Sequence, residues 1–130
     1  MRKLILFIVV ATCAVAIGCS RDAAVKSFLN EFESVTKEMT KKIDAGDIEG
    51  AKTVFDQNKE SLKRGFDSFK NAREIQVSAD TRKELEKSVM DNVKALSNAA
   101  QKAAISPGGD LSKTKAIQSL LKDFVGLFQM

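Results

Sequence analysis

The chain has 130 residues, of which 44% are hydrophobic and 29% charged, and its formal net charge is +4 at pH 7. Histidine, tryptophan and tyrosine are absent, so the chain lacks the commonest general base and transition-metal ligand and most of the aromatic rings that stack on nucleic-acid bases. This composition argues against a nucleophilic triad, a histidine-held metal and a nucleic-acid platform, and we predict a protein that is not an enzyme and needs no cofactor or metal.

The first twenty residues have the pattern of an export signal. Two basic residues precede Leu4–Ile17, an apolar segment that only Thr12 interrupts. The segment is shorter than the roughly 20 apolar residues that a membrane-spanning helix needs. It fits the ~7–15-residue apolar region of a secretory signal.

The residues Ala16-Ile17-Gly18-Cys19 resemble the lipobox of bacterial lipoprotein precursors, with Ala16 where that family usually has Leu. The resemblance implies that the Cys19 sulfur receives a diacylglyceryl group. It also implies that a signal peptidase cleaves between Gly18 and Cys19, and that the new amino group is acylated, typically with palmitate. Residues 1–18 would then be the signal peptide and residues 19–130 the mature domain. An ordinary cleaved signal and an uncleaved anchor are the alternatives.

The residue after the cysteine bears on the destination of such a lipoprotein. In the enterobacterial type, Asp at this position favours the inner membrane, and here it is Ser20. The resemblance therefore implies an outer-membrane lipoprotein with its mature domain in the periplasm or at the cell surface. Without the leader, 19 basic residues face 17 acidic ones, which is not the charge excess of a nucleic-acid binder.

Apolar residues that recur every three or four positions predict four helices in the mature chain. The first runs from about Asp22 to Ala45. Gly46 can end it in a left-handed conformation, and Asp47 can cap the start of the second helix. We expect the second helix to run from about Ile48 to Arg73.

The third predicted helix begins near Ser78 or Asp80, either of which can serve as its N-cap. Its apolar stripe comprises Leu85, Val89, Val93, Leu96, Ala100 and Ala103. The sequence SPGGD, residues 106–110, ends this helix, and Asp110 caps a fourth that runs to about Phe128. The last turns of the fourth helix are apolar on more than one face, which fits either a helix packed between two neighbours or an exposed patch or groove.

Four amphipathic helices with short loops predict an all-α fold, an antiparallel up-down four-helix bundle. A helical hairpin that carries two looser helices is the alternative. Only Ser20 and Arg21 separate Cys19 from the first helix, so the start of this helix should lie at the membrane. The opposite end of the bundle then carries two turns whose candidate partner-facing residues are Asp47, Pro107, Gly108 and Gly109.

Four lysines form a candidate basic stripe on the second helix. Lys52, Lys59, Lys63 and Lys70 are spaced by 7, 4 and 7 residues, which places them on one side of a helix. They either flank the core, with apolar stems covering it and charged heads in water, or form a track for anionic partners such as lipid phosphates or an acidic protein.

Together these features predict a lipid-anchored envelope protein, a non-enzymatic helical module with an interaction or structural role. Its partners would be the membrane, through diacylglyceryl-Cys19, and another envelope protein. The alternative is a periplasmic module that holds a small apolar or anionic ligand between its helices. An exposed apolar patch would favour the first function, and an enclosed apolar cavity the second.

Overall fold

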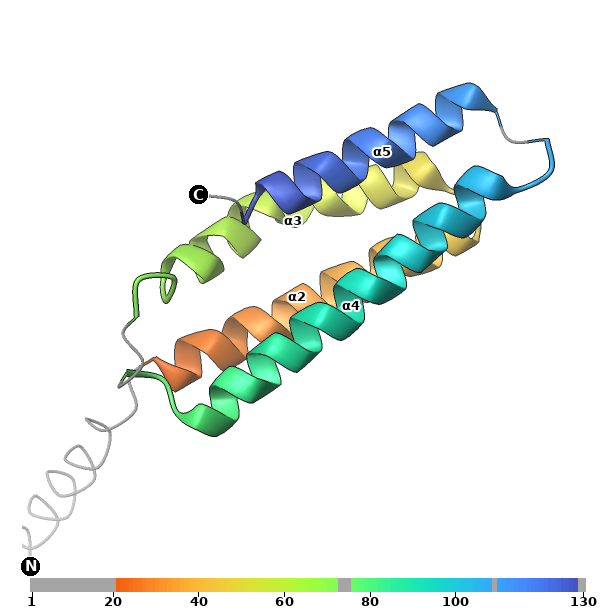
Figure 1. The fold of residues 1–130 in the computed structure, drawn as a ribbon. Coiled ribbons are helices and arrows are strands. Elements are labelled where there is room, and N and C mark those ends of the chain that lie inside the picture. The colour runs from red at the N-terminus through yellow and green to blue at the C-terminus, as the bar shows by residue number, and fades with distance from the viewer. Residues whose placement is uncertain (1–20, 73–75, 109, 129–130) are drawn as a thin grey trace, which may run out of the picture.

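The computed structural model describes residues 21–72, 76–108 and 110–128. Over these residues it contains four helices and no strand, which confirms the all-helical prediction. The helices are α2 (Asp22–Asp44), α3 (Ile48–Asp67), α4 (Ala79–Ile105) and α5 (Leu111–Gly126). The chain reverses direction at each connection (Figure 1). The predicted signal peptide of residues 1–18, the lipidation site Cys19 and the turn residue Gly109 lie outside the described residues.

Side-chain caps confirm the predicted starts of α3, α4 and α5. The Asp47 carboxylate accepts a hydrogen bond from the backbone N–H of Gly50 at 2.9 Å, and the Ser78 hydroxyl accepts one from the N–H of Thr81 at 3.3 Å. Asp110 caps α5 in the same way. These oxygens satisfy N–H groups that a helix start leaves without a partner.

The second helix is shorter than predicted, because it ends at Asp67 and not near Arg73. The Ser68 hydroxyl donates a hydrogen bond to the carbonyl of Gly65 at 2.6 Å, and the chain then turns. This turn brings the ring of Phe69 within 5.2 Å of the Phe28 ring centre. Phe69 is therefore buried, although it lies in a turn and not in a helix.

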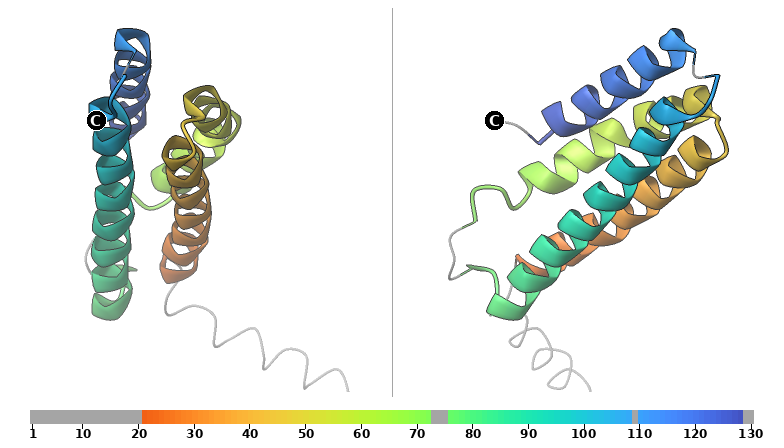
Figure 2. Two further views of the ribbon diagram at one scale, coloured as in Figure 1. Left: turned by 90° about the vertical axis from the view of Figure 1, so that its right-hand side faces the viewer. Right: turned by 45° about the vertical axis from the view of Figure 1, so that its right-hand side comes forward.

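Helix α2 packs along both α3 and α4, whereas α5 makes smaller contacts with α3 and α4. Helices α3 and α4 make little contact with each other, so the order around the bundle is α2, α3, α5, α4 (Figure 2). The connection between α3 and α4, residues 68–78, is the longest between the helices. Helices α3 and α4 lie on different sides of α2, and α2 and α4 run parallel as neighbours.

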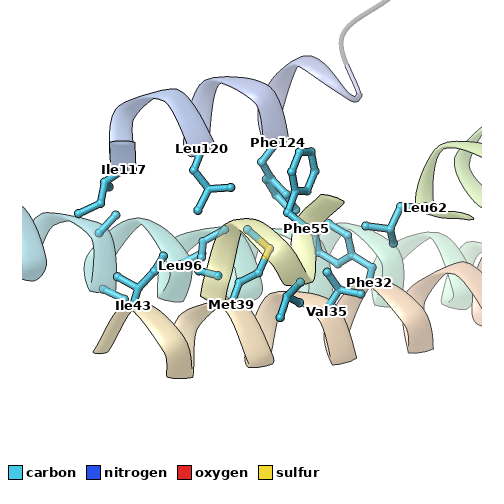
Figure 3. Close-up of a cluster of buried hydrophobic side chains, with 14 of the residues drawn as sticks. Phe32, Val35, Met39, Ile43, Phe55, Leu62, Leu96, Ile117, Leu120 and Phe124 are labelled. Carbon is cyan, nitrogen blue, oxygen red and sulfur yellow. The ribbon is translucent and has the colours of Figure 1, made fainter. Parts of the chain in front are cut away.

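All four helices contribute side chains to one core (Figure 3). The largest fully buried side chains are Phe32, Phe124, Met39, Ile43, Leu62, Leu96, Val25 and Thr36. The one polar member of this set, Thr36, donates its hydroxyl hydrogen to the carbonyl of Phe32 at 2.7 Å. Its burial therefore leaves no polar atom without a partner, as a packed core requires.

Candidate functional site

The start of α2 holds the ends of its two neighbours together. The Arg21 guanidinium donates to the carbonyl of Ser68 at the end of α3, and the Asp22 carboxylate accepts from the backbone N–H of Ser78 at 2.8 Å. The N–H and hydroxyl of Ser78 hold the pKa of Asp22 below its usual value. Farther along, the Ser88 hydroxyl donates to the Glu33 carboxylate at 2.5 Å and attaches α4 to α2.

A cluster of phenylalanine rings fills this end of the bundle. Phe28 is its centre, with ring centroids 5.6 Å from Phe32, 6.1 Å from Phe66, 5.2 Å from Phe69 and 6.0 Å from Phe128. The pairs with Phe32 and Phe66 are tilted, and those with Phe69 and Phe128 are edge-to-face, an arrangement that aromatic rings prefer. Three separate segments of the chain therefore meet through their aromatic rings.

An apolar groove of about 860 Å³ lies between this cluster and α4. We call it the phenylalanine groove, and its lining residues are Phe28, Phe32, Phe66, Phe69, Leu85, Glu86, Val89, Met90, Val93, Lys94, Ser97, Asn98 and Phe128. It forms because α5 has 16 residues and α4 has 27. Helix α5 therefore ends before it reaches the start of α4 (Figure 1).

Part of the predicted apolar stripe of α4 is not buried in the core, because it borders the groove. Leu85 and Val89 of the predicted stripe are only half-buried, and Val93 is 36% exposed. Beside them Met90 is 69% exposed. Leu85, Val89 and Val93 belong to the apolar stripe of α4, but at this end of the bundle they border the groove and no helix covers them.

Polar side chains occur at the edge of the groove. Glu86 lies near the end where α4 begins, whereas Lys94, Ser97 and Asn98 lie toward the middle of the bundle. Between them the α4 wall consists of apolar residues. The groove can therefore hold an apolar body and offer one ammonium group and hydrogen-bonding groups at one end.

The two predicted partner-facing turns lie together at the opposite end of the bundle. Gly46, Pro107 and Gly108 line a shared cavity of about 330 Å³. Asp47 stabilises this end of the bundle, because it caps α3 and forms an ion pair with Lys42 at 3.2 Å. The Gly50 N–H, together with Lys42, holds the pKa of Asp47 below its usual value.

The four lysines of the predicted basic stripe lie on α3 and in the turn that follows it, among carboxylates. Lys59 pairs with Asp56 at 3.1 Å, and Lys70 pairs with Asp67 at 2.9 Å. Lys63 lines a shallow cavity with both of these acids, and Lys52 lines another with Asp56. The surface is of mixed charge, which favours solvated lysines that flank the core over a purely cationic track.

Sequence reasoning missed the groove-lining residues Glu86, Met90, Lys94, Ser97 and Asn98. A usable signal was the predicted length of the helices, because the fourth was expected to be several residues shorter than the third. A shorter helix cannot cover the whole apolar stripe of its neighbour, so part of that stripe had to face solvent or a ligand.

Within the described ranges, no helix is long and apolar enough to cross a membrane, and no cluster of three or more Cys, Asp or Glu residues could hold a metal ion. Comparison with protein-family models, curated proteins and solved structures gives no significant match. The phenylalanine groove, which offers apolar contact and one nearby cation, is therefore the main basis for a functional interpretation.

Proposed function

We propose that this protein is a lipid-anchored, non-enzymatic envelope protein whose antiparallel up-down helical bundle binds an apolar ligand in the phenylalanine groove. The observation that carries the proposal is the groove itself, an apolar hollow of about 860 Å³ with exposed Met90 and Val93 on its α4 wall. Its volume lies in the ~300–1,000 Å³ range of ligand pockets, which are mostly apolar with a few placed polar groups.

The position of the groove supports a membrane-facing role. It lies at the end of the bundle where α2 begins at Asp22. Lipidation of Cys19, three residues earlier, would hold this end at the membrane surface, in our proposal that of the outer membrane. An apolar ligand could then pass between the bilayer and the groove over a short distance.

A dye-binding assay tests the groove. Phenylnaphthylamine, which fluoresces strongly in apolar surroundings, would be added to the chain from Ser20 onward. We expect enhanced fluorescence with the original chain and its loss in Val93→Glu. Val125→Glu is the matched control, because Val125 is 45% exposed and lies outside the groove. Equal enhancement with both variants would contradict binding in the groove.

A labelling experiment tests the anchor separately. Cells that express the full chain would be fed palmitate bearing an alkyne, and membrane fractions would be examined for the labelled protein. We expect the label and the membrane association to disappear in Cys19→Ser. Membrane association of an unlabelled Cys19→Ser chain would instead indicate an uncleaved anchor.

A second candidate function is that of an interaction module that uses the opposite end of the bundle. Ile105 and Leu111 are exposed there on either side of the turn that contains Pro107 and Gly108. Crosslinks from this turn to one recurring envelope protein in cells would support it. Crosslinks to unrelated proteins in similar amounts would argue against a specific partner.

A further inference from the structure

We propose that the ligand of the phenylalanine groove is a long-chain fatty acid, whose acyl chain lies lengthwise along α4 and whose carboxylate lies beside Lys94. This inference rests on the proposed function and names the class of its ligand. It follows from the length of the groove, the chemistry of its walls and the placement of charge at its two ends.

The length of the groove fits an extended chain. From Lys94, where the carboxylate lies, to Leu85, the α4 wall is about 14 Å long at the ~1.5 Å rise per residue of an α-helix. The acyl chains of one leaflet span about 15 Å, half of the ~30 Å hydrocarbon core of a bilayer. A compact apolar molecule would leave much of this wall in contact with water.

The walls suit a chain that makes no hydrogen bonds. Phenylalanine rings form one side, and Leu85, Val89, Met90 and Val93 form the other. The flexible, polarisable side chain of Met90 can adapt to an irregular alkyl surface. Since neither the chain nor these walls carry polar groups, binding would leave no polar atom buried without a partner.

The charges at the two ends of the groove give the ligand a direction. Lys94 and Asn98 lie toward one end and Glu86 toward the other. Within the described residues Lys94 forms no ion pair, so its ammonium group can donate hydrogen bonds to the carboxylate of a ligand. A carboxylate at the opposite end would meet the like charge of Glu86. Lys94 is the one cation among the lining residues, and it matches the single negative charge of a fatty-acid carboxylate.

A protein occupant fits the groove less well. The exposed lining is a small fraction of the about 800 Å² that each partner contributes to a standard protein interface. A second copy of the chain would therefore have to bury surface well beyond the groove, on parts of α4 that are charged. Crosslinks between two copies of the chain, in the experiment described next, would overturn the inference.

The experiment uses the full chain reconstituted in phosphatidylcholine vesicles. The probe is palmitic acid with a diazirine near the end of its chain, and crosslinked peptides are mapped by mass spectrometry after illumination. We expect labelling in the α4 segment from Leu85 to Val93, with competition by unlabelled palmitate and little by octanoate. Val93→Glu should reduce labelling about tenfold, which corresponds to about 1.4 kcal/mol, and Val125→Glu should leave it unchanged.

Two lysine variants test the headgroup. Lys94→Glu should lower labelling by the palmitate probe but not by the matching uncharged hexadecanol probe. Lys83→Glu is the control, because Lys83 is exposed on the same helix and lies outside the groove. An equal effect of both substitutions, or an equal effect on both probes, would overturn the placement of the carboxylate.

The remaining outcomes separate the inference from the proposed function. The fatty-acid inference is wrong if phenylnaphthylamine binds in the groove but octanoate competes as well as palmitate. It is also wrong if the dye binds there but Val93→Glu and Val125→Glu are labelled equally by the palmitate probe. In both cases the groove takes a different apolar ligand. If neither the palmitate probe nor the dye binds there, both proposals are wrong. If the main crosslinks join α4 of two copies, the groove is a self-association surface.

Discussion

The ring cluster allows a sharp test of how this bundle is stabilised. Phe28 and Phe55 are almost equally buried, at 3% and 4% exposure, so replacement of either by Leu removes a similar apolar area. They differ in their ring neighbours. Phe28 packs against Phe32, Phe66, Phe69 and Phe128, whereas within the described residues Phe55 forms a ring pair with Phe124 alone.

Each aromatic pair contributes about 0.5–1.5 kcal/mol beyond the burial of its area. Three additional pairs at the low end of this range make Phe28→Leu about 1.5 kcal/mol more destabilising than Phe55→Leu. That difference corresponds to a melting temperature lower by about 6 °C, at ~4 °C per kcal/mol. Urea unfolding followed by far-ultraviolet circular dichroism measures both free energies, since the chain has no tryptophan. Equal losses of stability would refute a contribution of the ring geometry beyond buried area.

Three further predictions concern the backbone, a cap and pH. Gly46→Ala should lower the free energy of unfolding by about 1 kcal/mol, because the φ of Gly46 is +78°. Gly126→Ala should raise it by up to about 1 kcal/mol, because Gly126 is helical and has open space around it. Thermal melts of the two variants measure both changes. Ser78→Ala should cost about 1 kcal/mol, as loss of an N-cap does, with the helix content of the folded protein unchanged. Asp22 and Glu33 have pKa values lowered by hydrogen bonds from Ser78 and Ser88, so their stabilising effect is present at neutral pH and is lost as the pH falls below about 4. Asp22→Asn should therefore destabilise the protein more at pH 7 than at pH 3, and an equal effect at both values in urea titrations would contradict the assignment.

The local features of the fold could be read from the sequence because they depend on neighbouring residues. The caps Asp47, Ser78 and Asp110 act within three positions of their own place in the chain. The apolar spacing that predicted the helices is likewise a property of single segments. The end of α3 was missed because Phe69 continues the helical spacing, although tertiary packing against Phe28 holds it in a turn.

The arrangement of the helices could not be read in the same way. Nothing in the local pattern of α4 distinguishes Leu96, which the bundle buries, from Val93, which borders the groove. That difference depends on where α5 ends and on which helices are neighbours, both of which are decided by contacts between distant segments. The predicted helix lengths indicate that part of the α4 stripe stays uncovered, but only the assembled bundle shows which residues border the groove. Lipidation of Cys19 stays a prediction from the first twenty residues.

The two sides of the groove are held differently, and this predicts where the protein adjusts to a ligand. Helix α4 is attached to α2 by the Ser88–Glu33 hydrogen bond, and its start is tied to Asp22 through Ser78. Phe128, at the end of α5, joins the cluster through ring contacts, and α5 makes the smaller helix contacts of the bundle.

Segments with fewer packed contacts open more easily, and their amide hydrogens exchange faster. Saturation with palmitate should therefore slow hydrogen exchange in the last two turns of α5 more than in the first two turns of α4, as measured by mass spectrometry of peptic fragments. Val93→Glu, with the same palmitate concentration, is the control that should remove the difference. Greater protection at the start of α4 would show that α4, despite its hydrogen bonds to α2, is the side that moves.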